Sequence, residues 1–130
     1  IAFTMPLAAV MGMAGEESTL NVQDGGKFSM YRAIFVVVDK GKAENVMDIA
    51  REAGARGGTI INARGSGIHE TATFLNMEIE PEKEIVLMLT LTSMTDDIVA
   101  AIRDNLRIDE PGQGILFVQE VSETYGLVNG

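Results

Sequence analysis

Four stretches of the sequence combine β-branched, aromatic and other apolar residues and predict strands. Residues 31–38 end in a continuous apolar run, which is typical of a buried central strand. Residues 58–63, 84–91 and 115–121 show the same kind of composition. Each strand is followed by glycine, charged or other turn-forming residues, so the pattern predicts four separate strands after residue 30.

Two segments between these strands carry apolar residues at helical spacing. The first helix is expected from Lys42, and its apolar face consists of Val46, Ile49, Ala50 and Ala53. The second is expected to be capped by Ser93 or Thr95, with Asp96 and Asp97 in its first turn, where the helix dipole favours anions. Its buried face consists of Ile98, Val99, Ile102 and Leu106.

The order strand-helix-strand-strand-helix-strand predicts an α+β fold of the ferredoxin-like βαββαβ type. Both helices should cover one face of an antiparallel sheet and leave the other face for a partner subunit. Residues 64–76 form the predicted loop between the second and third strands, and residues 109–114 form a turn before the last strand. Because a bare apolar sheet face is rare in soluble monomers, we expect subunits to assemble through this face.

The first residues predict a further strand. Residues 1–13 align with residues 115–127, with identities at positions 1, 3 and 12, and apolar residues alternate along the first eight positions. We interpret residues 1–13 as the tail strand of a preceding repeat, residues 14–29 as a linker and residues 30–130 as the domain. Chance similarity between two apolar strands is the alternative. Pro6 lacks an N–H, so the strand is expected at a sheet edge.

Composition narrows the classes of function. Hydrophobic residues make up 46% of the 130 residues and the net charge is -9, which indicates a globular chain without a Lys/Arg run for binding nucleic acid. Cysteine is absent, which excludes disulfides and cysteine chemistry and is consistent with a cytoplasmic protein. The apolar start, residues 1–15, is too short to span a bilayer, and we expect no membrane insertion.

Two glycine-containing segments carry a family resemblance. Residues 54–67 read GARGGTIINARGSG and residues 111–118 read PGQGILFV. The first is similar to the second strand of the PII-type nitrogen-regulatory (signal-transduction) family, which ends in a G-x-G at the base of its long loop. The second is similar to the G-x-G turn and strand that close the fold of that family. The resemblance covers residues 30–121, and both segments lie where the βαββαβ order requires.

The resemblance implies a regulatory homotrimer rather than an enzyme. Family members bind adenine nucleotides, sometimes with 2-oxoglutarate, in clefts between subunits, and their loop docks on a transporter or enzyme. This chain departs from the pattern in three ways. Its loop is short and contains no tyrosine, Ile115 stands where a lysine is usual, and residues 122–130 contain no Arg or Lys. We therefore expect binding of ATP in the standard manner to be weak or absent.

The candidate ligand-binding residues come from these two segments. Arg64 could pair with a phosphate or carboxylate, and the backbone N–H groups of the glycines could approach an anion. The full set is Gly57, Thr59, Arg64, Gly65, Gly67, Gly112, Gln113 and Gly114. The alternative is that Arg64 is a solvated surface residue and that the glycines only serve tight turns. Any ligand is expected between residues 64–67 of one subunit and residues 111–114 of another.

Two other functions remain as alternatives: a trimeric assembly module whose ligand site has decayed, and a metal-handling protein of the related CutA-like architecture. His69 is the single histidine and has no His/Cys cluster to complete a metal site. Glu78, Glu80 and Glu82 alternate and could share one side of an extended segment, where a solvated acidic edge is the simpler interpretation. No nucleophile, base and orienting residue are tied together by the sequence.

Overall fold

The computed structural model describes residues 7–11, 30–65, 72–74, 77–79 and 81–127 of the chain. Its elements, in chain order, are β1 Leu7–Met11, β2 Tyr31–Asp39, α1 Ala43–Glu52, β3 Thr59–Arg64, β4 Ala72–Phe74, β5 Met77–Ile79, β6 Glu82–Leu91, α2 Thr92–Leu106 and β7 Ile115–Glu120. From β2 onward, the main elements follow the predicted βαββαβ order, with β4 and β5 added between the second and third predicted strands.

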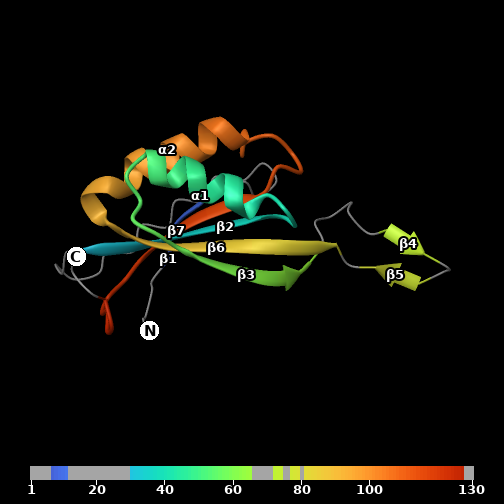
Figure 1. Ribbon diagram of the computed structural model, residues 1–130, viewed down its shortest axis with the longest axis horizontal. Coiled ribbons are helices and arrows are strands. Elements are labelled where there is room, and N and C mark those ends of the chain that lie inside the picture. The colour runs from blue at the N-terminus through green and yellow to red at the C-terminus, as the bar shows by residue number, and fades with distance from the viewer. Residues whose placement is uncertain (1–6, 12–29, 66–71, 75–76, 80, 128–130) are drawn as a thin grey trace.

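The main sheet has the order β1-β7-β2-β6-β3, and every neighbouring pair of strands is antiparallel. The predicted central strand, β2, pairs with β6 on one side and β7 on the other. Figure 1 shows both helices on the same side of this sheet. The ferredoxin-like prediction, with helices on one face only, is therefore confirmed.

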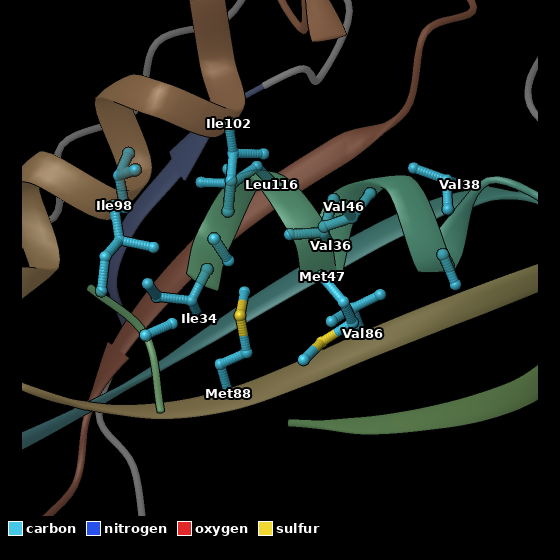
Figure 2. Packing of buried hydrophobic residues seen from close by; sticks show 14 of the residues in the cluster. Ile34, Val36, Val38, Val46, Met47, Val86, Met88, Ile98, Ile102 and Leu116 are labelled. Carbon is cyan, nitrogen blue, oxygen red and sulfur yellow. The ribbon is translucent and has the colours of Figure 1, made fainter. Parts of the chain in front are cut away.

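The core lies between the helices and one face of the sheet (Figure 2). Alternate residues of β2 point into it, so Ile34, Val36 and Val38 are buried whereas Phe35 and Val37 are not fully covered. The other core residues, from both helices, β6 and β7, include Val46, Met47, Ala50, Val86, Met88, Ile98, Ile102 and Leu116. Side chains alternate between the two faces of a strand and recur on one face of a helix about every 3.6 residues. These two repeats place the buried residues in one layer between the helices and the sheet.

The start of α2 differs from the prediction. The helix begins at Thr92 after Leu91, no side chain caps it, and its first turn contains no acidic residue. Thr95 is 1% exposed, and its hydroxyl donates to the Leu91 carbonyl at 2.9 Å and contacts the Thr90 hydroxyl at 2.8 Å. The cap predicted for Ser93 or Thr95 is wrong, because Thr95 lies inside the helix and bonds the carbonyl four residues earlier.

The segment predicted as one loop, residues 64–76, contains part of a hairpin. Strands β4 and β5 pair antiparallel, with Phe74 opposite Met77 and Ala72 opposite Ile79. Thr73, Phe74 and Ile79 are β-forming residues. The glycines and the serine earlier in the segment had favoured the prediction of a loop. In Figure 1 this two-stranded sheet extends beyond the end of β3 and β6.

An additional strand lies at one edge of the sheet. β1 pairs antiparallel with β7, with Met11 opposite Leu116, and a register irregularity falls between Leu7 and Ala9. The predicted edge strand is thus present over residues 7–11; the alternating residues before it lie outside the described part of the chain. β1 reaches only as far as Leu116, so it leaves the start of β7 uncovered.

Candidate functional site

The two glycine-containing segments meet the same end of the main sheet. β3 ends at Arg64, β2 ends at Asp39, β6 begins at Glu82 and β7 begins at Ile115. The antiparallel register places Arg64 opposite Glu82 and Asp39 opposite Lys83. This end of the sheet therefore gathers strand termini that are widely separated in sequence, and most of them carry charge.

Ion pairs connect these strand ends. The Lys40 ammonium lies 2.7 Å from a Glu82 carboxylate oxygen, and the Lys40 backbone N–H donates to the Glu82 carbonyl at 3.2 Å. The Lys83 ammonium lies 2.6 Å from the Asp39 carboxylate. The side chain of Lys83 is only 12% exposed, whereas those of Lys40 and Glu82 are 66% and 52% exposed. The Lys83 pair is thus a structural link, and the Lys40 pair is open to solvent.

The charges of Lys40 and Glu82 shift each other's protonation. The hydrogen bond from Lys40 is the main cause that lowers the pKa of Glu82, with the Lys40 charge next and a smaller contribution from Arg64. The same hydrogen bond raises the pKa of Lys40. Both groups therefore stay charged over a wider pH range than free side chains do.

A cavity of about 440 Å³ lies at this position, lined by Lys40, Asn62, Ala63, Arg64, Glu82 and Lys83. Three of these residues are cationic and one is anionic, although the chain as a whole has a net charge of -9. Asp39 neutralises Lys83, so Lys40, Arg64 and Glu82 together leave one excess positive charge, which suits a small anion. Of the lining residues, the sequence indicated only Arg64; Lys40, Asn62 and Lys83 were missed, and Glu82 was interpreted as part of a solvated edge.

The structure corrects the role of Glu82 and limits that of Gly65. Glu82 is 52% exposed and therefore solvated as predicted, but it also contacts Lys40 at 2.7 Å and lies on β6, which is not an edge strand of the main sheet. The Gly65 backbone N–H donates to the Pro81 carbonyl at 3.1 Å, which closes the base of the intervening segment and takes that donor away from any ligand. Gly67, Glu80 and His69 lie outside the described residues.

Gly57 and Thr59 are not brought to this site. Thr59 is the first residue of β3 and Arg64 is the last. At about 3.3 Å per residue, the two ends of this strand are roughly 16 Å apart. Thr59 lies opposite Leu87, next to the row that contains Phe35 and Phe117. Thr59 therefore belongs to the uncovered sheet face, and Gly57 precedes the start of β3, at the end of that strand far from the charged site.

The second glycine segment is shaped by backbone requirements. Gly112 and Gly114 have φ values of +81° and +132°, a backbone conformation that residues with a side chain rarely adopt. A Cβ on Gly114 would lie 2.6 Å from the Val37 carbonyl oxygen, so this glycine allows β7 to start close to β2. A Cβ on Gly112 would meet nothing within 4 Å. Gln113 is half-buried between them, and its N–H donates to the Glu110 carbonyl at 3.4 Å.

Within one chain the two segments cannot share a small ligand. β2 and β6 lie between β7 and β3 in the sheet. With neighbouring strands about 4.8 Å apart, Arg64 and the turn at Gly112 are separated by roughly 14 Å. A site that used both would need a second copy of the chain.

The described residues give little support for a metal site or a membrane-spanning helix. No group of three or more His, Cys, Asp or Glu residues is placed to hold a metal ion in the part of the chain that the structure describes. Over the same residues, no helix has both the length and the apolar composition needed to cross a membrane.

Comparisons with known proteins agree with the fold described above. Residues 31–129 match the family described as nitrogen regulatory protein P-II. One similar solved structure is Arabidopsis thaliana PII bound to citrate, with a TM-score of 0.53 and 20% identity, covering 73% of this chain and 78% of that one. Another is a B. subtilis GlnK–ATP complex, with a TM-score of 0.55 and 18% identity, covering 74% of this chain and 86% of that one. A search of curated proteins found no match.

Proposed function

The chain belongs to the nitrogen regulatory protein P-II family, and on this basis we propose that it is a ligand-sensing regulator that works as a homotrimer. It binds a small anionic metabolite or an adenine nucleotide at the charged end of the sheet. The segment between β3 and β6, rooted at this end, reports the ligand to a partner protein such as a transporter or enzyme.

The cationic cavity beside Arg64 is the observation that carries this proposal. It lies where β3 passes into the segment with the β4–β5 hairpin, so a ligand there contacts the root of that segment. The Gly65 N–H bond to the Pro81 carbonyl ties both ends of the segment together at the same place. A ligand that repositions Arg64 would therefore act directly on the direction in which the hairpin leaves the sheet.

The uncovered face of the sheet supports assembly into a trimer. Phe35, Val37, Ile85, Leu87 and Phe117 are half-buried there, and Ile61 and Ile115 are 41% and 37% exposed. An apolar face of this kind usually marks an interface. Three inward-facing copies would cover it, and they would place β3 of one chain beside the start of β7 of the next. In that arrangement the turn at Gly112 of one chain would lie next to Arg64 of another, which is not possible within one chain.

The nature of the ligand follows from the charges. Citrate and ATP, named with the two similar structures, are both multivalent anions. Ile115, next to the turn at Gly112, carries no charge, and residues 122–127 contain no Arg or Lys. A triphosphate would therefore find cations on the β3 side only. We propose a small polycarboxylate or a nucleotide with fewer phosphates as the better ligand, bound without a further cofactor in the cytoplasm.

Calorimetric titration tests the function. ATP, ADP, AMP, citrate and 2-oxoglutarate are titrated in turn into the wild-type protein and into Arg64→Ala. At least one anion should bind the wild type, and Arg64→Ala should weaken that binding by roughly 1.5–3 kcal/mol if the guanidinium makes a charge-assisted bond. Absence of binding for every anion would favour the alternative, an assembly module with a decayed ligand site.

A further inference from the structure

Glu82 lies between two cations that come from different strands. Its carboxylate contacts the Lys40 ammonium at 2.7 Å, just beyond the end of β2. On the other side, Arg64 is its direct partner across β3 and β6. Side chains of directly opposed residues start roughly 4.5–5.5 Å apart at Cβ. The carboxylate of Glu82 therefore occupies the position between Lys40 and Arg64 that an anionic ligand would take.

The remaining charges around the cavity are committed to the fold. The Lys83 side chain is only 12% exposed, and its ammonium is held by Asp39 at 2.6 Å. The Glu84 carboxylate accepts the backbone N–H groups of Gly41 and Ala43, at 2.5 and 3.3 Å, and so fixes the start of α1. Neither group can turn toward a ligand without breaking these bonds. Lys40, Glu82 and Arg64 are the groups left to respond.

The contact between Lys40 and Glu82 is suited to exchange. More than half of each side chain is exposed to solvent. Exposed ion pairs contribute little to stability and are screened by salt, because water solvates both partners once they separate. A carboxylate held in this way can be replaced without disturbing the sheet, whose backbone hydrogen bond between Lys40 and Glu82 remains in place.

We propose that Glu82 is a specificity-determining residue, an internal competitor that a ligand must displace from Lys40 and Arg64. This inference rests on the proposed function. A monovalent anion would replace one carboxylate by another and gain little. An anion with two or more negative charges adds attraction that Glu82 alone does not supply. With Glu82 in place, the site therefore retains only anions that carry two or more charges.

The test compares Glu82→Gln with Asp48→Asn by calorimetric titration with citrate and acetate. Both variants remove one negative charge, but Asp48 lies on the exposed surface of α1, where it pairs with Arg51. Glu82→Gln should bind citrate about fivefold more tightly, the effect of removing one like charge at about 4 Å in water. It should also bind acetate measurably, whereas the wild type should not. Asp48→Asn should stay within about twofold of the wild type.

The outcomes separate this inference from the proposed function. Citrate binding to Glu82→Gln that is equal to or weaker than wild-type binding overturns the competitor role, while the proposed function stands as long as the wild type binds. If only Glu82→Gln binds citrate, the result supports the competitor role and shows that citrate is not a ligand of the wild type. If neither protein binds either anion, the competitor role fails, and the proposed function is then decided by the titrations with nucleotides and 2-oxoglutarate. A circular dichroism spectrum equal to that of the wild type confirms that each variant is folded.

Discussion

The rings of Phe35 and Phe117 stack face to face on the neighbouring strands β2 and β7, with centroids 4.7 Å apart and planes inclined by 8°. Both lie on the sheet face that the helices do not cover, in register with Leu87 of β6. Stacked aromatic rings at a water-exposed surface leave much of their apolar area in contact with solvent. This pair therefore marks the centre of the face that we assign to the subunit interface.

A charge in this stack should prevent assembly. Phe35→Glu places a carboxylate at the centre of the uncovered face, where trimer formation would bury it without a partner. We expect a monomer at micromolar concentration by light scattering. Asn45→Glu, which adds the same charge at an exposed position of α1, should remain trimeric. A Phe35→Glu protein of unchanged mass would show that this face is not the interface.

Gly114 should tolerate substitution less well than Gly41. Both have positive φ, +132° and +93°, so alanine is strained at either position. Only at Gly114 would the added Cβ meet the Val37 carbonyl, at 2.6 Å, whereas nothing lies within 4 Å at Gly41. We expect Gly41→Ala to lower the free energy of unfolding by about 1 kcal/mol and Gly114→Ala by about 3 kcal/mol or more. Urea unfolding measures both; equal losses would mean that β7 does not depend on this close approach.

The buried hydroxyl pair should show coupling. The Thr95 hydroxyl donates to the Leu91 carbonyl, so the proton shared at 2.8 Å between Thr90 and Thr95 comes from Thr90. Thr95→Val removes the acceptor and should lower the free energy of unfolding by about 1–3 kcal/mol. Thr90→Val combined with Thr95→Val should lower it by less than the sum of the single changes. Additive losses in this double-mutant cycle would argue against the bond.

Removal of residues 1–13 should destabilise the protein. We propose that this segment is the tail of a preceding repeat, joined by the linker 14–29. β1 pairs with β7, and its loss would leave the N–H and C=O groups of that edge without their strand partner. We expect a lower melting temperature, by about 4 °C for each kcal/mol lost. A deletion that leaves both melting temperature and oligomeric mass unchanged would make β1 dispensable.

The fold followed from the sequence because its main elements have strong periodic patterns. Ile34, Val36 and Val38 alternate with Phe35 and Val37, and that alternation determines which face of β2 meets the helices. The start of α2 was misassigned because Thr95 has the chemistry of a cap but is buried against Thr90. Local preference does not show which residues tertiary packing will cover.

The site was only partly predictable. Arg64 was found because it adjoins a glycine motif. Lys40 and Glu82 were missed because their contact depends on the register between β2 and β6, which joins residues more than forty positions apart. The alternation of Glu78, Glu80 and Glu82 suggested one acidic edge, whereas β5 ends at Ile79 and Glu82 belongs to β6. The partner of a charged residue at a strand end can be predicted only once the pairing of the strands is known.

Complementation between two variants tests most directly whether the ligand lies between copies of the chain. Arg64→Ala removes the cation on β3, and Gly112→Asp puts a carboxylate on the other segment, where an added Cβ meets nothing within 4 Å. Each variant alone should bind citrate at least about tenfold more weakly than the wild type. Refolded together in equal amounts, they should regain about a quarter of the wild-type sites, because random trimers contain that share of interfaces with both native residues. Light scattering must show that each variant is still a trimer. No recovery of binding in the mixture, or normal binding by either variant alone, would contradict a site shared between subunits.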